Sequence, residues 1–204
     1  MSTVLVESNV DASLQAQFST KGYAVLRGAI STEVMGLVHR YARLQLPIKG
    51  YFELDPKSIS MGRYADGMGE ALLVELLPKL AEVAGGPLLP AYSFLRFYTS
   101  DSSLSKHVDR PSCEISATLT VGYQADRLWP IFVESEGCDT PVALDVGDIM
   151  LYKGPEVPHW REPLPSGYWL QLFCHYVRAD GAFVEHRFDG RGRVGPLLEL
   201  KGAA

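Results

Sequence analysis

Hydrophobic positions change their spacing near residue 90, and this change divides the chain into two parts. Before it, apolar residues recur at helical spacing over residues 34–44 and 72–83, which predicts two amphipathic helices. Gly85 directly follows the second stretch and favours the end of that helix, whereas Pro78 inside it predicts a kink or a division. A short apolar run at residues 22–26 fits one strand. The first part is therefore predicted to be mainly helical.

After residue 90 the apolar residues form short runs that are separated by turn-rich segments. Runs of this length and spacing are typical of a β-sandwich or a jelly-roll barrel. Helices that precede the strands, instead of alternating with them, argue against a parallel α/β sheet. The predicted strands cover residues 92–98, 114–123, 128–134, 141–144, 149–152 and 168–177.

The length of 204 residues suits one domain with a sizeable core. We expect a single domain over residues 1–204 with a mainly β, α+β architecture, in which N-terminal helices pack on one sheet. Residues 1–90 form the helical support, residues 91–179 the jelly-roll core and residues 180–204 a C-terminal extension. The extension is rich in Gly and Arg, and its weak pattern fits either an ordered flap or a frayed end.

Composition and charge narrow the classes of partner. Hydrophobic residues make up 47% and charged residues 21% of the chain, and the net charge is −5. These values are ordinary for a soluble globular protein and give no reason to expect nucleic acid or an anionic membrane as the partner. The first residues lack the pattern of a secretory signal, and no apolar run is long enough for a membrane span. The scattered cysteines predict reduced thiols in a cytoplasmic protein; they are Cys113, Cys138 and Cys174.

The candidate chemistry lies in a His-x-Asp triplet and a later histidine. His107 and Asp109 are two residues apart, and His159 follows about fifty residues later, after strands that can return the chain to the same place. Two imidazoles and one carboxylate that leave three positions open are the ligand set of non-haem ferrous oxygenases. His175 is a rival for the distal ligand, although its apolar strand favours a core position or a supporting one. His39 and His186 are expected at the surface.

Several segments around this triplet resemble the 2-oxoglutarate and Fe(II)-dependent oxygenases of the prolyl-hydroxylase-like type. The resemblance runs from about Ser93 to Tyr176. More narrowly, the residues after Asp109 and after His159 look like a bacterial and phage subgroup whose substrates are largely unassigned. The matching segments are Leu95-Arg96-Phe97-Tyr98, His107-Val108-Asp109, Gly147-Asp148-Ile149-Met150-Leu151-Tyr152 and His159-Trp160-Arg161-Glu162-Pro163.

The resemblance implies a double-stranded β-helix of the jelly-roll or cupin-like type. It implies that His107, Asp109 and His159 hold Fe(II), and that 2-oxoglutarate is the cosubstrate, which O2 converts to succinate and CO2. Halogenating relatives replace the carboxylate by a small residue, so Asp109 favours hydroxylation, or a related desaturation or demethylation.

The residue that holds the distal carboxylate of 2-oxoglutarate is less clear from the sequence. Most relatives place an Arg or Lys about ten residues beyond the distal histidine, where this chain has no basic residue. Arg161 is the first choice, because it is two residues beyond His159 and projects to the same side of a strand; pairing with Glu162 is its other interpretation. The remaining candidates for cosubstrate binding are Lys153 and Arg96 as alternative cations, Gln171 as a neutral hydrogen-bonding partner, and Tyr98, which matches a tyrosine of prolyl hydroxylases.

The substrate is predicted only as a class, a small molecule or a side chain presented by a protein or carrier. Arg110, Glu114 and Trp160 are candidate substrate residues, and residues 49–69 and 100–106 are the expected borders of the pocket. A cupin-like metalloenzyme that does not use 2-oxoglutarate is the alternative enzyme. A noncatalytic binding module on the same fold is the alternative from another class. The sequence leaves the oligomeric state open.

Overall fold

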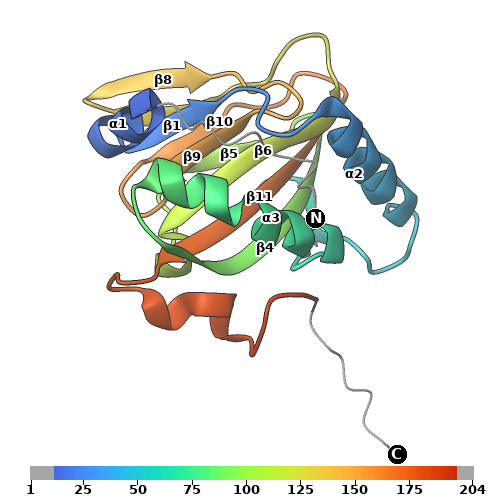
Figure 1. Cartoon of the computed structure of the whole chain (residues 1–204). Helices are drawn as coiled ribbons and strands as arrows, with labels where there is room; N and C mark the ends of the chain where they lie inside the picture. The colour runs from blue at the N-terminus through green and yellow to red at the C-terminus, as the bar shows by residue number, and fades with distance from the viewer. Residues whose placement is uncertain (1–11, 197–204) are drawn as a thin grey trace, which may run out of the picture.

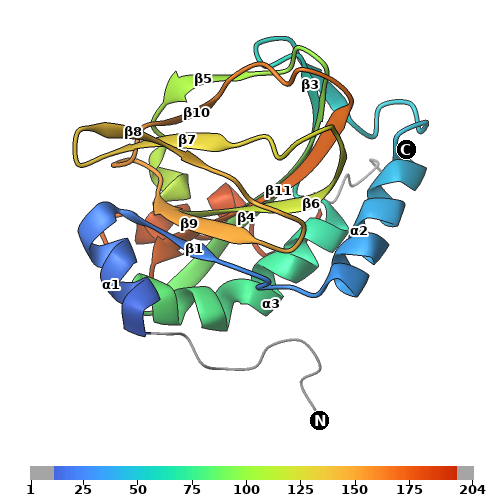
Figure 2. The ribbon, with the colours of Figure 1, turned by 90° about the horizontal axis from the view of Figure 1, so that it is seen from above.

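The computed structural model describes residues 12–196, which form two antiparallel sheets with helices on one side (Figures 1 and 2). Figure 2 shows the smaller sheet above the larger one and the three α-helices below the larger sheet. This is the α+β jelly roll that the sequence predicts. The helices are α1 (Ala12–Lys21), α2 (Thr32–Gln45) and α3 (Gly67–Ala84).

The larger sheet has seven strands and the smaller sheet has four. The order in the larger sheet is β1 (Tyr23–Leu26), β9 (Ile149–Lys153), β6 (Ile115–Gln124), β11 (Tyr168–Arg178), β4 (Leu88–Thr99), β3 (Ser60–Tyr64) and β2 (Glu53–Asp55). The order in the smaller sheet is β5 (Leu104–His107), β10 (His159–Arg161), β7 (Ile131–Ser135) and β8 (Cys138–Val142).

The central strands of the larger sheet are buried on both faces, and the two faces differ in chemistry. Because side chains alternate along a strand, each strand contributes to both faces. On β11, Leu170 and Leu172 join the apolar core beneath the helices. Gln171 and His175 face the other way, into the space between the sheets, where Gln171 contacts Thr118 and His175 lines a cavity. The helices therefore stabilise one face of the sheet and leave the polar residues of the other face for a site.

Helix α3 is continuous through Pro78, so the predicted division of this helix is wrong. Asp66 caps its first turn, and Gly85 ends it in the left-handed conformation with φ 74°. Proline removes the hydrogen bond to the carbonyl four residues earlier. That residue is Val74, which is half exposed on the outer face of the helix, so water can replace the lost bond. Leu73 and Leu76 hold the inner face against the sheet.

Several short elements escaped the prediction. Helix α1 buries only Phe18, so its apolar stripe is too weak to detect. Strands β2 and β3 form a hairpin within residues 49–69, for which no strand was predicted. Strands β5 and β10 contain four and three residues, and runs this short carry no readable period.

Residues 180–196 of the C-terminal extension pack on the end of the sheet. Its short helix η2 (Val184–Gly190) contacts β4, and Figure 1 shows it as a separate layer below the sheet. Arg191 donates to Glu70 Oε2 at 3.0 Å and to the carbonyl of Ala91. Glu70 is a buried carboxylate of α3 that also accepts hydrogen bonds from Ser93. Residues 180–196 are therefore part of the folded domain, as one of the two sequence interpretations proposes for the extension.

Replacing Arg191 by methionine is expected to lower the free energy of unfolding by about 3 kcal/mol, because it leaves a buried carboxylate without its cation. Chemical denaturation of the two proteins measures the difference. The exposed residue Arg193 provides a control, and Arg193→Met is expected to change the unfolding free energy by less than about 0.5 kcal/mol. Equal losses in both variants would contradict this role of Arg191.

Candidate metal and cosubstrate site

The two sheets bring His107, Asp109 and His159 together. His107 ends β5 and His159 begins β10, and the two histidines are direct partners in the antiparallel ladder. Their rings lie 4.3 Å apart between centroids. Asp109 follows β5, and its Oδ1 atom is 3.7 Å from Nε2 of each histidine. The three residues form a cluster whose donor atoms all lie within 4.8 Å of one another.

Backbone hydrogen bonds orient both imidazoles toward Asp109. Nδ1 of His107 is 2.8 Å from the carbonyl of Ser105, and Nδ1 of His159 is 2.9 Å from the carbonyl of Val157. A carbonyl only accepts, so Nδ1 carries the proton in each ring and Nε2 presents its lone pair. Such bonds to the far nitrogen are the usual support of histidine ligands.

The electrostatics of the cluster keep the carboxylate ionised. Burial acts to raise the pKa of Asp109, but attraction to His107 and to the other neighbouring histidines outweighs it and holds the pKa at about 2. The nearby carboxylate of Asp109 raises the pKa of His107, whereas burial lowers that of His159. An ionised carboxylate beside two imidazole lone pairs is a donor set that fits a divalent transition metal.

Two residues outside the cluster fix Asp109 in place. Ser116 Oγ donates to Asp109 Oδ2 at 3.0 Å, which leaves Oδ1 for the histidine side. Gly154 accepts a backbone hydrogen bond from Asp109. A Cβ atom on Gly154 would lie 2.7 Å from Asp109 Oδ2 and 2.2 Å from the carbonyl oxygen of Cys113. Only glycine fits this position, because both neighbours are held by other contacts.

Gly154→Ala is therefore expected to displace Asp109 and to weaken divalent metal binding by at least about 10-fold, the scale seen when supporting residues of metal ligands are changed. Overpacking of the site is expected to cost about 1–3 kcal/mol of stability as well. Titration with Co(II), followed by its visible absorption, measures the affinity, and thermal unfolding measures the stability. Gly36 has open space around its Cα, so Gly36→Ala is the control; the account is contradicted if both variants bind Co(II) like the wild type.

Arg161 is buried without a counter-ion on β10, two residues beyond His159. Its side chain is 2% exposed, and in the described part of the chain it forms no ion pair with any carboxylate. One nitrogen donates to the carbonyl of Trp129, the guanidinium lies 4.5 Å from the centre of the Trp129 ring, and Nε has no partner among residues 12–196. Burial lowers the pKa of Arg161 to about 10, so it stays charged at neutral pH. Glu162, the partner considered from the sequence, contacts Trp160 instead.

Tyr98 and Gln171 both lie in the interior, but only Tyr98 has a polar group without a hydrogen-bond partner among the described residues. The hydroxyl of Tyr98 is buried and has no hydrogen-bond partner in the part of the protein that the structure describes. Tyr98 lines the cavity beside the cluster. Gln171, in contrast, accepts from Trp169 Nε1 and donates to Thr118. Tyr98 is therefore available to a ligand, whereas Gln171 already serves the core.

The two alternative cations are occupied. Arg96 lines the cavity, but it pairs with Asp55 at 3.0 Å and also donates to Ser58 and Ser60. Lys153 lies on the opposite face of β9 from Tyr152, where it pairs with Glu156 and contacts the ring of Phe18. Lys153 does not reach the cavity.

The three candidate substrate residues are not brought together. Arg110 stacks on Tyr92 at the wall of the cavity and forms a bidentate pair with Asp189. Glu114 accepts from the backbone of Arg178, away from the cluster. Trp160 points to the outer side of the smaller sheet, where it stacks on Phe132.

The cavity beside the cluster has a volume of about 190 Å³. Besides the three cluster residues, it is lined by Tyr92, Phe94, Arg96, Tyr98, Leu104, Tyr152, Phe173 and His175. His175 thus lines the cavity and is not a member of the cluster with His107 and His159.

His39, expected at the surface, is half-buried and stacks on Tyr168. Of the two expected borders, residues 100–106 contribute Leu104, and residues 49–69 line a different hollow.

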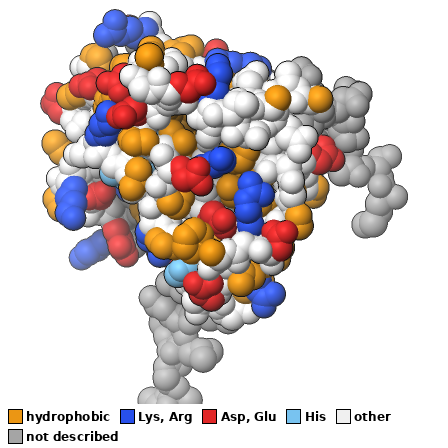
Figure 3. Space-filling model, turned by 90° about the vertical axis from the view of Figure 1, so that its left-hand side faces the viewer, with side chains coloured by type: hydrophobic (Ala, Val, Ile, Leu, Met, Phe, Trp, Pro, Cys, Tyr) orange, Lys and Arg blue, Asp and Glu red, His pale blue; other side chains and the backbone are white. Residues whose placement is uncertain are grey.

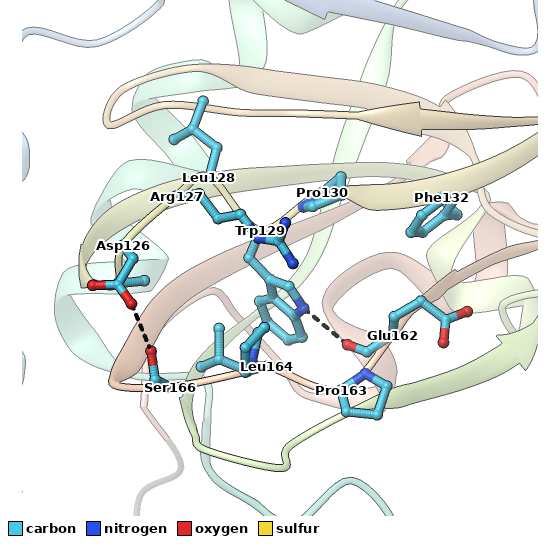
Figure 4. A pocket seen from close by; sticks show the side chains of 12 residues that line it. Asp126, Arg127, Leu128, Trp129, Pro130, Phe132, Glu162, Pro163, Leu164 and Ser166 are labelled. Carbon is cyan, nitrogen blue, oxygen red and sulfur yellow. Dashed lines mark hydrogen bonds between the residues drawn. The ribbon is translucent and has the colours of Figure 1, made fainter.

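A larger hollow of about 630 Å³ shares Trp129 as a wall (Figure 4). Figure 4 shows Trp129 fixed by a hydrogen bond to the carbonyl of Glu162, and Ser166 bonded to Asp126 across the opening. None of the cluster residues lines it. The convergent donor atoms and the free hydroxyl of Tyr98 line the smaller cavity, which is therefore the candidate site.

The fold and the cluster together define a jelly roll with a two-histidine, one-carboxylate cluster in its interior. No protein-family model and no curated protein sequence matches the chain. Among solved structures, the fold is similar to a Pseudomonas putida prolyl-4-hydroxylase, with a TM-score of 0.67 at 14% identity over 82% of this chain and 98% of that one. It is also similar to the α-ketoglutarate-dependent epimerase SnoN of nogalamycin biosynthesis, with a TM-score of 0.73 at 12% identity over 92% of each chain.

A third similar structure is HygX from Streptomyces hygroscopicus with nickel and 2-oxoglutarate bound, with a TM-score of 0.66 at 13% identity over 84% of this chain and 89% of that one. These structures confirm the predicted fold, that of the 2-oxoglutarate and Fe(II)-dependent oxygenases. At such low identity they define the fold alone.

Sequence reasoning missed several residues of the site. Ser116, Gly154 and Trp129 carry no motif, and only their contacts with Asp109 and Arg161 give them a role. Gly154 has a weak signal, since a glycine directly after a buried strand often marks a close approach of two backbones.

Proposed function

We propose that this protein is a non-haem oxygenase that uses Fe(II), 2-oxoglutarate and O2. The observation that carries the proposal is a buried, unpaired guanidinium, that of Arg161, two residues beyond His159 on β10 and close to Tyr98, a residue that lines the cavity beside the cluster. An unpaired buried cation is costly unless an anion accompanies it. A ligand that has a carboxylate at one end and metal-chelating oxygens at the other satisfies both parts of the site. The similarity in fold to the 2-oxoglutarate-bound HygX structure supports the same choice.

Each residue has a defined task in this proposal. His107, Asp109 and His159 hold the iron through Nε2, Oδ1 and Nε2. Arg161 binds the distal carboxylate of 2-oxoglutarate, and the free hydroxyl of Tyr98 donates to the same group. Trp129 covers the guanidinium and keeps water from it, which strengthens the ion pair. When bound together, iron and 2-oxoglutarate supply oxidising chemistry in which 2-oxoglutarate and O2 yield succinate and CO2.

The walls of the cavity indicate the kind of group that is oxidised. Arg96 is neutralised by Asp55, Arg110 behind the Tyr92 wall is neutralised by Asp189, and the other walls are mostly aromatic. A volume of about 190 Å³ is below the usual range for a drug-sized ligand. We therefore propose that a small, uncharged part of the substrate enters the cavity while the remainder stays outside. The substrate is a small molecule, or a side chain presented by a protein or carrier.

We propose hydroxylation as the reaction. Asp109 occupies the position that halogenating enzymes leave to a halide, which favours transfer of oxygen. The similar structures include a prolyl hydroxylase and an epimerase, so the fold accommodates more than one outcome. Analysis of products by mass spectrometry, after a screen of amino acids and peptides for substrate-stimulated succinate formation, distinguishes a gain of one oxygen from isomerisation.

The surface and the helices agree with a small-molecule enzyme. Acidic, basic and hydrophobic side chains are interspersed on the face shown in Figure 3. None of the helices within residues 12–196 combines the length and hydrophobicity needed to cross a membrane.

The proposal is tested by adding 2-oxoglutarate to the Fe(II)-loaded protein without oxygen. We expect a weak visible charge-transfer band, because chelation by the keto acid places a π-acceptor on ferrous iron. Succinate, which lacks the keto group, is the control and is expected to give no band. Bound iron without a band would contradict the use of 2-oxoglutarate and would favour a cupin-like metalloenzyme that works without it.

A further inference from the structure

A single residue, Ser116, lies between His175 and the metal cluster. His175 is buried, 6% exposed, on β11, between the rings of Tyr92 and Phe173. Its Nδ1 atom is 2.9 Å from Ser116 Oγ, and this hydroxyl is 3.0 Å from Asp109 Oδ2. A continuous path of polar atoms therefore joins His175 to the carboxylate of the cluster.

The single proton of the Ser116 hydroxyl determines the direction of these bonds. Three acceptors surround Oγ: Asp109 Oδ2, the carbonyl of Cys113 at 3.1 Å and Nδ1 of His175. If the proton pointed to His175, the ionised carboxylate would face the lone pairs of Ser116 at 3.0 Å, which is repulsive. The arrangement without repulsion has Ser116 donating to Asp109 and His175 donating to Ser116. This requires the Nδ1–H tautomer of a neutral His175.

The burial of His175 agrees with the neutral form. Burial lowers its pKa to about 4, so the ring is uncharged at neutral pH. A carboxylate that binds a metal ion is deprotonated. The pair Ser116 and His175 thus acts on Asp109 through oriented dipoles and adds no second charge that would compete with a cation for the carboxylate.

A direct metal role for His175 fits these contacts less well. Asp109, Cys113 and His175 also approach one another within 4.8 Å. However, the thiol of Cys113 is hydrogen-bonded to Tyr92 at 3.2 Å, and burial raises its pKa to about 12, so it stays protonated. Nδ1 of His175 is already taken by Ser116. These hydrogen bonds occupy the Cys113 thiol and Nδ1 of His175, the atom of the ring that faces Ser116.

We propose that His175 is a positioning residue for the metal site, which acts through Ser116 to hold Asp109 Oδ2 and thereby aims Oδ1 at the two histidines. This rests on the proposed function only in that a divalent metal occupies the cluster; neither 2-oxoglutarate nor a substrate is needed for it. Removing either member of the pair lets the carboxylate rotate. Metal binding must then immobilise the carboxylate, and this entropy cost weakens the binding of the metal.

The test compares metal affinities of the full chain by Co(II) titration. We expect Ser116→Ala and His175→Phe each to weaken Co(II) binding by about 10–100-fold, the usual cost of removing a supporting partner of a metal ligand. His175→Asn is the rescue variant, because the side-chain NH2 group of asparagine can donate to Ser116 from near the position of Nδ1. It is expected to bind Co(II) within a few-fold of the wild type.

A matched control separates positioning from general destabilisation. Ser93 is also a buried serine that donates to a buried carboxylate, that of Glu70, on the helix side of β4. Ser93→Ala therefore removes the same kind of bond and is expected to leave Co(II) affinity unchanged. Thermal unfolding of the metal-free proteins verifies that all variants fold. If a variant does not fold, the tautomer measured in the wild-type protein still decides the proposal.

The tautomer is measured by nitrogen NMR of protein labelled with ¹⁵N-histidine. For His175 we expect a protonated Nδ1 and an unprotonated Nε2; the opposite pattern would overturn the proposal. Unchanged Co(II) affinity in folded Ser116→Ala and His175→Phe would overturn it as well and would leave the oxygenase proposal intact. A wild-type protein that binds no Co(II), Fe(II) or Mn(II) would contradict both, and its own titration would reveal this.

Discussion

Asp109→Ala is expected to weaken Fe(II) binding by more than about 100-fold, beyond the 10–100-fold cost of changing a residue that only supports a ligand. The variant loses one of three ligands and also the negative charge that offsets the charge of the ion. The two histidines that remain carry no net charge when they bind metal. Anaerobic titration of the metal-free protein with Fe(II) measures the change. Oxygen-dependent formation of succinate from 2-oxoglutarate is expected to fall below detection in the same variant.

The control for this prediction removes another buried carboxylate. Asp148, which is 6% exposed, pairs with Arg27 and accepts from the backbone of Gly28, far from the cluster. Asp148→Ala is expected to lower stability but to leave Fe(II) affinity unchanged once the protein is folded. If Asp109→Ala binds Fe(II) as tightly as the wild type, the assignment of the cluster is wrong.

Arg161→Met is expected to have the second large effect, a loss of 2-oxoglutarate affinity of about 30- to 1000-fold, or roughly 2–4 kcal/mol, which is the scale for truncating one partner of a buried charge pair. Methionine keeps the length of the side chain and removes the charge. Fe(II) affinity is expected to stay the same, because Arg161 contacts no member of the cluster. Titration of the anaerobic iron protein with 2-oxoglutarate, followed by its charge-transfer band, measures the change.

The stability of the cofactor-free protein provides an independent readout for Arg161. The substitution removes the cost of an unpaired buried cation and also removes a hydrogen bond to Trp129. These effects oppose each other, so we expect a change in unfolding free energy of less than about 1 kcal/mol. A binding-site residue behaves in this way, whereas an arginine that served only the fold would cost stability.

Two variants decide between the cations considered from the sequence. Lys153→Met is expected to leave 2-oxoglutarate affinity unchanged, because Lys153 lies outside the cavity. Arg96→Met is expected to reduce it by less than about 10-fold, since the charge of Arg96 is already balanced by Asp55 and a screened pair contributes at most about 1 kcal/mol. A larger loss of affinity for the Arg96 variant than for the Arg161 variant would identify Arg96, on β4, as the residue that binds the distal carboxylate.

The cluster could be predicted from the sequence because its chemistry is local. His107 and Asp109 are two residues apart beside a strand, and their side chains reach the same space whatever the remaining fold. His159 required the pairing of β5 with β10, two strands too short to read from a pattern. The family resemblance supplied that link, and the ladder places the two histidines opposite each other.

The surroundings of the cluster could not be predicted, because they depend on pairings between distant strands. Ser116 reaches Asp109, and His175 reaches Ser116, only because β6 and β11 are neighbours with Ser116 opposite His175. Likewise, Arg161 and Arg96 look alike in the sequence. Only the tertiary structure reveals that Asp55 neutralises Arg96 and that Arg161 has no carboxylate partner among the described residues.

The cytoplasmic location and the choice between hydroxylation and related reactions stay predictions. So does the substrate, because the cavity sets the size and charge of the group that enters and not its identity. The proposed arrangement, with an iron ligand and the cosubstrate anchor on one short strand, is more specific. His159 and Arg161 are about 7 Å apart along β10 at the rise of an extended strand, so a shift of this strand moves both.

In the proposed complex, one small molecule joins the His107, Asp109 and His159 cluster to Arg161. This complex can be seen directly in a crystal structure of the protein with 2-oxoglutarate and Mn(II), which replaces Fe(II) to prevent turnover. We predict Mn(II) at about 2.0–2.3 Å from Nε2 of both histidines and from Oδ1 of Asp109, the range for nitrogen and oxygen ligands. We also predict the distal carboxylate of 2-oxoglutarate within hydrogen-bond distance of Arg161 and Tyr98. A metal held by His175 in place of His159, or a distal carboxylate bound to Arg96 while Arg161 stays unpaired, would contradict this arrangement of the site.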